Sequence, residues 1–521
     1  MTNLRPLAAA VLIGTALATP LQAEVTADQV WVLMQDALTE PGFALTGTEN
    51  RQGDRLVLSG LRLTFETGEV VELPEITLLE MPDRSVVVSL PPRFPLVVDL
   101  PPNAMEPKNF SVTVAAPDLA ITVRGLGEQT DVSLTAGSVS ASLDPIDFPA
   151  IGDFPKADVF FALALADLAA NWKVTMNGTE LAVQSTFSLG TVHGDIRMDV
   201  PEDQVKADIS FDISAIDARL NGFAPADTEA TIARIDQSTE PKVAEILALL
   251  DRGLMLDAGL TIGAVSVRAD VPSNPDGAFT LDLTSQDGVG TLTLDRTGAA
   301  GMGTIGKSRA FVQLMGPDAP FTEVEIGMEE FSEGGLFGFP QPGVVDSPAW
   351  GFVYRLKGIT VSDNIWDLVD SGKLLARGPV SMVIDLGGTY ALDPAFLQPG
   401  WVFADALGPT PFTAVTVELN ELMAEGLGAS TVGTGSLAFD LVDPVMIEDF
   451  ILPEGKVGFV TTGANGLIDA LSAMGRLTDD ERTAARFALL FIGRIEDGAD
   501  RLVSNLEFRD GGFFLNGQKI R

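Results

Sequence analysis

The stretch VKADISFDIS, from Val205 to Ser214, alternates apolar and polar residues over its whole length. In a β-strand, successive side chains point to opposite faces, so this stretch predicts a strand with one apolar and one polar face. Strands with one polar, solvent-facing side are typical of antiparallel sheets. The apolar positions are Val205, Ala207, Ile209, Phe211 and Ile213.

The same period of two recurs along the chain, in FTLDLTS, TEVEIGME, VSMVIDL, TAVTVEL, GSLAFDL and SNLEFRD. We therefore predict a mainly β fold with minor α content. Large curved antiparallel sheets of amphipathic strands would carry a few amphipathic helices packed on or between them. The residues predicted to line an apolar face are Ile209, Phe211, Ile213, Phe279, Leu281, Leu283, Val324 and Ile326.

Two strands change the parity of their apolar residues at a glycine. In RLVLSGLRLTF (55–65) the change falls at Gly60, and in WGFVYRLKGITV (350–361) it falls at Gly358. A glycine bulge inserts one extra residue and bends the strand. Both stretches therefore predict bent strands. The C-terminal stretch 502–517 predicts a β-hairpin that turns at Arg509–Gly512.

Helical spacing of apolar residues is confined to a few segments. It predicts helices over 26–40, 238–253, 362–372, 467–474 and 478–493. Thr478 and Glu481 form the pattern of a capping box at the start of the last helix. The apolar stripes of these helices are expected to face the core. The stretch NGFAPADTEA (221–230) is expected to be a loop.

The N-terminus has the layout of a secretory signal. Arg5 precedes the apolar run Leu7–Ala18, and the small residue Ala23 precedes Glu24. We expect cleavage between Ala23 and Glu24, and a periplasmic location. No later window has the roughly 20 apolar residues that a spanning helix needs, so no transmembrane segment is expected after signal removal. The chain has no cysteine and hence no disulfide.

The charge balance is strongly acidic. The chain has 33 basic and 72 acidic residues, a formal net charge of −39. Nucleic-acid binding needs a basic footprint, and no cluster of Lys and Arg is present. The composition therefore excludes nucleic acid as a partner and favours a well-solvated surface.

The stretch GMGTIGKS, Gly301–Ser308, fits the spacing of a phosphate-binding loop. Such a loop must lie between a buried strand and a helix, whose N-terminus holds the phosphates. The upstream stretch VGTLTLDRTGAA alternates, and the downstream RAFVQLMGPDAP reaches Gly316-Pro317 too soon for the expected helix. We therefore expect a glycine turn between strands with an exposed Lys307, and no nucleotide site.

Other chemical signals are weak. His193 is the only histidine, whereas zinc sites that use histidine usually have two or more. A Ser-His-Asp relay through His193 stays open, but no G-x-S-x-G motif is present. Ser362–Asn364 is interpreted as a helix cap rather than part of an enzyme motif. No catalytic, cofactor-binding or metal-binding residue is predicted, and the chain is expected not to be an enzyme.

The domain organisation is predicted from the helix at 238–253. Residues 1–23 form the signal and 24–237 an N-terminal β-rich half. The segment 238–253 is a connecting helix. Residues 254–521 form a C-terminal β-rich half that ends in a helical pair and a hairpin. Two separate domains and an internal duplication both remain open, as does the oligomeric state.

The C-terminal half resembles a domain-of-unknown-function family of exported alphaproteobacterial proteins of similar length. The resembling residues are Ile365, Trp366, Asp370, Arg377 and Pro379, then the strand end Asp385–Gly388, and the stretches 424–440, 463–492 and 504–518. The resemblance implies export and a β-rich fold. The family has no assigned activity, so the resemblance implies no catalytic residue.

Two functions remain. One is binding of a lipid or other apolar ligand on a curved apolar sheet face, provided that this face is an open trough rather than a filled core. The alternative is a structural or assembly factor of the cell envelope that acts through protein contacts.

Overall fold

The computed structural model describes residues 25–39, 43–65, 67–100, 109–148, 157–201, 205–236, 243–273, 277–316, 323–341, 347–393, 411–447, 450–496 and 500–521. Within these residues the chain is mainly β, with large antiparallel sheets and six helices. The predicted fold class is confirmed. The signal residues, including Ala23 and Glu24, lie outside the described part of the chain.

The chain divides into two compact units. Unit 1 comprises Met1–Asp227, Leu256–Thr284 and Gln313–Ala319, and unit 2 comprises Thr228–Met255, Ser285–Val312 and Pro320–Arg521. Strands β15, β17 and β20 have residues in both units. Each unit is described by itself below.

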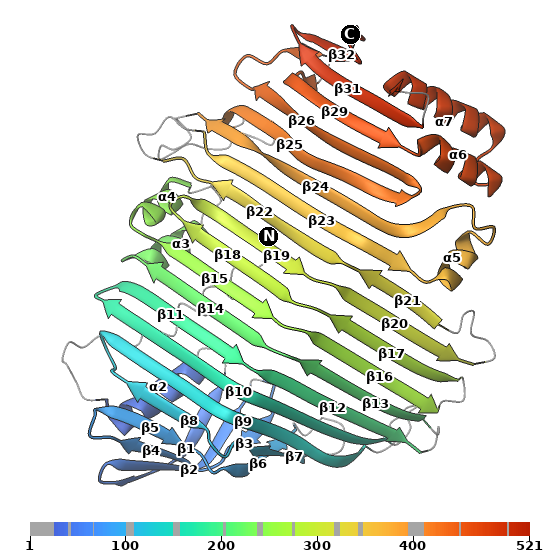
Figure 1. Cartoon of the computed structure of the whole chain (residues 1–521). Helices are drawn as coiled ribbons and strands as arrows, with labels where there is room; N and C mark the ends of the chain where they lie inside the picture. Colours follow the sequence, from blue (N-terminus) through green and yellow to red (C-terminus); the bar gives the residue numbers. More distant parts are fainter. Residues whose placement is uncertain are drawn as a thin grey trace. The chain divides into compact units, whose positions relative to one another are not determined.

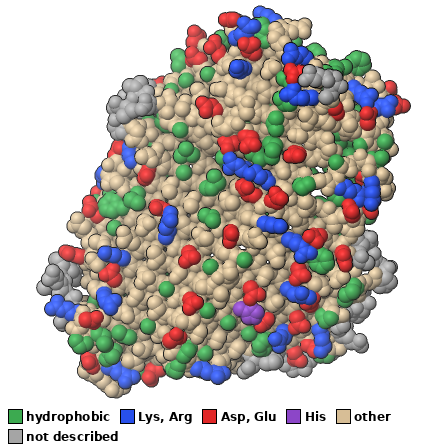
Figure 2. All heavy atoms as spheres, viewed as in Figure 1, with side chains coloured by type: hydrophobic (Ala, Val, Ile, Leu, Met, Phe, Trp, Pro, Cys, Tyr) green, Lys and Arg blue, Asp and Glu red, His purple; other side chains and the backbone are tan. Residues whose placement is uncertain are grey.

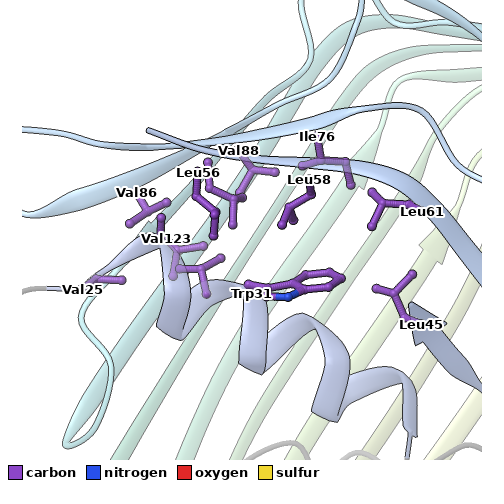
Figure 3. Close-up of a cluster of buried hydrophobic side chains, with 13 residues drawn as sticks. Val25, Trp31, Leu45, Leu56, Leu58, Leu61, Ile76, Val86, Val88 and Val123 are labelled. Atoms are coloured by element: carbon purple, nitrogen blue, oxygen red, sulfur yellow. The ribbon is translucent and has the colours of Figure 1, made fainter. Parts of the chain in front are cut away.

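The N-terminal part of unit 1 packs a helix on short antiparallel strands (Figure 1). Its elements are α2 (Ala27–Thr39), β1 (Ala44–Gln52), β2 (Arg55–Thr64), β3 (Val70–Glu72), β4 (Ile76–Glu80), β5 (Ser85–Ser89), β6 (Arg93–Asp99), β7 (Asn109–Ala115) and β8 (Ala120–Arg124). Trp31 of α2 lies among the apolar side chains of these strands, and its Nε1 donates to Glu49 at 2.7 Å (Figure 3). The predicted core-facing stripe of α2 is therefore confirmed.

The bulge predicted at Gly60 is present in β2. Its pairing with β1 shifts by one residue between Thr46 and Thr48, opposite Gly60, whose φ is 59°. Leu58 and Leu61 consequently both point into the core, although an unbroken strand would turn them to opposite faces.

The remaining strands of unit 1 are longer and pair antiparallel throughout. They are β9 (Gln129–Phe148), β10 (Ala157–Asn177), β11 (Glu180–Leu189), β12 (Thr191–Val200), β13 (Val205–Ile213), β14 (Ile216–Ala224), β15 (Met255–Ile262), β16 (Val265–Ser273) and β17 (Ala278–Ser285). The first half of β10 pairs with β12, and the second half pairs with β11.

Unit 2 is a second series of antiparallel strands with helices at their ends (Figure 1). Its strands are β18 (Gly288–Asp295), β19 (Gly298–Ile305), β20 (Ser308–Met315), β21 (Glu323–Met328), β22 (Glu330–Gly338), β23 (Ala349–Val361), β24 (Ala376–Leu392), β25 (Phe412–Leu427), β26 (Ala429–Asp440), β27 (Met446–Ile447), β28 (Phe450–Ile451), β29 (Glu454–Thr462), β30 (Arg494–Ile495), β31 (Arg501–Arg509), β32 (Gly512–Leu515) and β33 (Gln518–Lys519). β31 and β32 form the predicted C-terminal hairpin.

The helices of unit 2 are α3 (Thr228–Asp236), α4 (Val243–Asp251), α5 (Asp363–Val369), α6 (Ala464–Ala473) and α7 (Asp479–Ile492). All except α3 fall within predicted helical segments or extend them at the start. The capping box of Thr478 and Glu481 at α7 is confirmed.

Two expectations about the helices were wrong. The predicted loop 221–230 instead contains the end of β14 and the start of α3, because Thr228 begins a helical turn after the Pro225–Asp227 connection. The apolar stripe of α7 does not face a core: Phe487, Leu490 and Phe491 are exposed. Helical spacing shows that a helix has an apolar side but does not show what covers it.

In each unit, several strands continue into the next strand through a short irregular segment. These segments lie side by side on neighbouring strands, and we call each such series a crease. In unit 1, β13 passes into β14 through Ser214–Ala215, and β15 into β16 through Gly263–Ala264. Ser214 N donates to Ala264 O at 2.9 Å, and Gly263 N donates to Ala215 O at 2.8 Å. The hydrogen-bond ladder therefore continues through the crease.

The crease of unit 2 includes the segment that fits a phosphate-binding loop. β19 passes into β20 through Gly306–Lys307, and Gln286 N donates to Lys307 O at 2.8 Å. In β23 the crease is the predicted bulge at Gly358, with φ 68° and a shift in pairing with β24 between Leu356 and Ile359. The extra residue keeps Leu356 and Ile359 on one face, as the sequence predicts.

Candidate functional site

Unit 1 places three of the predicted lining residues on one face. Ile209, Phe211 and Ile213 of β13 pair directly with Ile196, Gly194 and Val192 of β12, so their side chains share that face. The pairing continues into β10, where the partners are Phe161, Leu163 and Leu165. On the other side, β16 adds Ala269, Val267 and Val265. These residues form three parallel apolar rows.

The predicted lining residues of β17 join the same face. Thr280 donates to Asp270 at 2.9 Å, and Asp282 lies 3.9 Å from Arg268. Asp270 and Arg268 pair with the polar positions of β13, so Thr280 and Asp282 lie on the polar face. The alternate positions Phe279, Leu281 and Leu283 therefore lie on the apolar face of unit 1.

The last two predicted residues lie in unit 2. Val324 and Ile326 are alternate residues of β21, and Ile326 pairs with Val361 of β23. Val361 follows Ile359 on the face that also carries Leu356. Val324 and Ile326 thus belong to the apolar face of unit 2.

The most extensive feature of this face was not identified from the sequence. Directly paired residues form one continuous line across ten strands, from β18 to β32. We call this line the long row. Its members are Leu292, Gly301, Gly335, Phe352, Leu386, Leu419, Gly435, Val457, Leu506 and Leu515. None of them is charged or polar.

The apolar face of unit 2 is only partly covered. Leu292 and Phe352 of the long row are each 44% exposed, and Met382, two rows away on the same face, is 38% exposed. A sheet face that packs against a second layer buries such side chains almost completely. This part of the face is therefore accessible to solvent.

One glycine of this face lies beneath an aromatic ring of the next strand. Gly433 of β26 pairs with Phe459 of β29, and a Cβ at Gly433 would lie 2.5 Å from the Phe459 ring. The ring thus occupies the space that a side chain at position 433 would fill. The sequence shows the glycines, but only the register reveals which rings lie over them.

One end of the face is built from aromatic residues. Tyr390 of β24 is 3% exposed, stacks on Phe337 with ring centroids 4.9 Å apart, and meets Phe412 edge-on at 5.5 Å. Its hydroxyl donates to Gly338 O at 2.5 Å. Burial raises the pKa of Tyr390 to about 12, so the side chain is neutral at physiological pH.

The opposite face of unit 1 carries paired charges. Lys206 lies 2.9 Å from Asp199, and Arg268 lies 2.6 Å from Asp270. Figure 2 shows acidic and basic side chains side by side, with a single purple histidine among them. These exposed pairs solvate the polar face and contribute little to stability individually.

His193 belongs to this polar face. Its Nδ1 contacts Asp212 at 2.7 Å and its Nε2 contacts Asp195 at 3.1 Å. The hydrogen bond with Asp212, helped by that with Asp195, raises the pKa of His193 above its ordinary value. Because both ring nitrogens contact carboxylates, this arrangement does not form a Ser-His-Asp relay.

The segment Gly301–Ser308 has the local structure expected for a strand connection. Gly301 lies within β19, Lys307 is exposed, and the Ser308 hydroxyl contacts Ser285 and Gly306. The next element is β20, whereas a phosphate-binding loop leads into a helix. Lys307 is exposed as expected, but the expected glycine turn is absent: Gly306–Lys307 interrupts the strand at the crease, and the chain continues from β19 into β20.

The described residues contain no group of three His, Cys, Asp or Glu side chains arranged to hold a metal ion. Among the helices of this described part, none has the length and apolarity needed to cross a membrane.

No model of a known protein family, no curated protein and no solved structure matches this chain. The resemblance of the C-terminal half to an exported family therefore stays a prediction.

Proposed function

We propose that the protein binds an elongated apolar ligand, such as a lipid acyl chain, on the apolar face of unit 2. The long row carries this proposal, because it offers uncharged side chains across ten strands and remains partly exposed. The proposal includes a periplasmic location and a non-enzymatic role.

The energetics of exposed apolar surface support this function. Removing apolar surface from water contributes about 25 cal/mol per Å². Soluble monomers rarely expose continuous apolar patches larger than a few hundred Å², and larger ones usually mark binding sites. An acyl chain laid over Leu292 and Phe352 would gain this free energy without any polar contact. Such a ligand would be recognised by its shape and apolarity.

Two leucines provide a matched test of this proposal. Leu292 lies on the long row and is 44% exposed, whereas Leu336 of β22 is 45% exposed and lies on the opposite face. We expect Leu292→Gln to weaken binding of a fluorescent fatty acid by about tenfold, and Leu336→Gln to leave it unchanged. Fluorescence titration measures both affinities, and circular dichroism checks that both variants fold. Equal losses, or no binding by the unaltered protein, would refute the proposal.

A role in envelope assembly is the second candidate, and one observation favours it. The β27–β28 hairpin projects apolar side chains into solvent, with Phe450 77% exposed. Crosslinking in the periplasm from a photoreactive residue at position 450 would test this role. One reproducible protein partner, lost in Phe450→Ser, would support the assembly role. Crosslinks spread over many proteins would count against it.

A further inference from the structure

The helix α7 leaves one apolar side uncovered. Its outer side carries Phe487 and Phe491, which are 68% and 67% exposed, and Leu490, which is 55% exposed. Arg486, whose side chain is 43% exposed, pairs with Asp469 of α6, and Leu489 is half-buried. A helix on a globular protein normally turns its apolar side inward and its charged side to water.

Specific contacts hold α7 in this orientation. The capping box of Thr478 and Glu481 sets the first residue of α7. The pair between Arg486 and Asp469 joins α7 to α6, and Figure 1 shows the two helices side by side at the ends of β26 and β29. The three exposed side chains occupy positions i, i+3 and i+4, so they form one continuous patch. We call Phe487, Leu490 and Phe491 the α7 patch.

Basic residues lie close to the α7 patch. The stretch from Arg482 to Ile495 has three arginines and no acidic residue, whereas the first turn of α7 is acidic. Arg482 pairs with Asp479. Arg494 is 69% exposed, and its pair with Glu496 is a surface contact that can exchange for another anion. Guanidinium groups donate well to phosphate oxygens.

We propose that the α7 patch docks on the surface of a phospholipid bilayer. The two phenylalanines and Leu490 would enter the boundary between headgroups and acyl chains, and Arg494 would donate to lipid phosphates. A bilayer accepts a convex helix without a preformed groove. A second copy of this chain is disfavoured, because both copies carry a net charge of −39. Docking would bring the protein to a source of acyl chains, but it does not depend on binding by the apolar face.

Vesicle flotation tests the docking. The probe is a phosphatidylcholine vesicle, since this lipid has phosphates but no net charge to repel an acidic protein. The protein is purified after export, and mass spectrometry confirms that all variants share one N-terminus. We expect the unaltered protein to float with the vesicles, and the triple variant Phe487→Ser, Leu490→Ser, Phe491→Ser to lose at least about tenfold in partitioning.

The control is Ile232→Ser on α3, which removes an apolar residue that is 51% exposed on a different helix. It should float like the unaltered protein. Phe491→Trp should in addition be quenched by brominated lipid. Failure of the unaltered protein to float, or flotation of the triple variant at the same level, would overturn the proposal. So would a dimer in solution that the triple variant converts to a monomer. Fatty-acid titration of the triple variant reports separately on the apolar face.

Discussion

The ring of Phe211 lies over the backbone of Gly194 on the paired strand. A Cβ at Gly194 would come within 2.2 Å of two ring atoms, and the two residues are direct partners between β12 and β13. Phe211 therefore packs flat against the sheet. This packing depends on a glycine in the neighbouring strand, so we expect the two positions to be energetically coupled.

We expect Gly194→Ala to destabilise the protein by about 1–3 kcal/mol, because the ring of Phe211 must leave its position. Urea unfolding followed by circular dichroism measures the change. In a Phe211→Leu background the cost of Gly194→Ala should shrink, because the smaller side chain leaves room for the methyl group. An equal cost in both backgrounds would show that the ring is not responsible.

Tyr390 should make stability depend on alkaline pH. Its pKa is raised from 10.0 to about 12 in the folded protein, so the folded state favours the neutral hydroxyl. The stabilisation is present below about pH 10, the ordinary value, and is lost as the pH rises toward 12. Unfolding titrations at several pH values should show this loss, and Tyr390→Phe should remove it. The same variant loses the hydrogen bond to Gly338 O, at a cost of about 1–2 kcal/mol at neutral pH.

His193 should titrate above the ordinary histidine value, because Asp212 and Asp195 stabilise its charged form. The stabilisation is present at low pH and is lost as the pH rises through the pKa of the folded state. Its size should stay below about 1 kcal/mol, since the pair is exposed to solvent. His193 is the only histidine, so its ring proton resonance can be followed by NMR without assignment. Asp212→Asn should lower the measured pKa, and an unchanged value would contradict the role of Asp212.

Gly358 should tolerate few substitutions. Its φ of 68° is costly for residues with a side chain, and a Cβ there would lie 2.4 Å from the side chain of Glu329. We expect Gly358→Ala to cost about 1–2 kcal/mol. Gly358→Asn should cost less, because asparagine adopts this backbone region more readily. Thermal unfolding of the two variants ranks them, and the reverse order would argue against backbone conformation as the cause.

The alternation of residues such as those at Val205–Ser214 predicts both the strands and their apolar faces, because side-chain direction has a fixed period in a strand. The bulges at Gly60 and Gly358 are predictable for the same reason. The apolar positions shift by one residue at each glycine, and an extra residue in the strand is needed to keep them on one face. The crease at Ser214–Ala215 carries no such signal. Its residues are ordinary, and the interruption is defined by hydrogen bonds to Gly263–Ala264, distant in the sequence.

The candidate site was predicted only in part. The amphipathic strands that contain Leu386 and Leu419 are visible in the sequence, but their alignment into the long row requires the register of every pair between them. The α7 patch shows a second limit of prediction from sequence, which concerns which side of a helix is covered. Helical spacing identifies Phe487 and Phe491 as one side of a helix, and the sequence does not show that Arg486 pairs with α6 while this side stays uncovered.

The length of the long row determines how many acyl chains it can hold. Ten strands at the usual spacing of about 4.8 Å span about 43 Å. The hydrocarbon core of a bilayer is about 30 Å thick and holds two acyl chains end to end. One acyl chain would thus cover about a third of the long row, and no polar side chain of the row would fix its position. Several tails fit in series, so saturation should exceed one ligand per protein. Affinity should rise with the length of the fatty acid, because each added methylene buries more apolar surface.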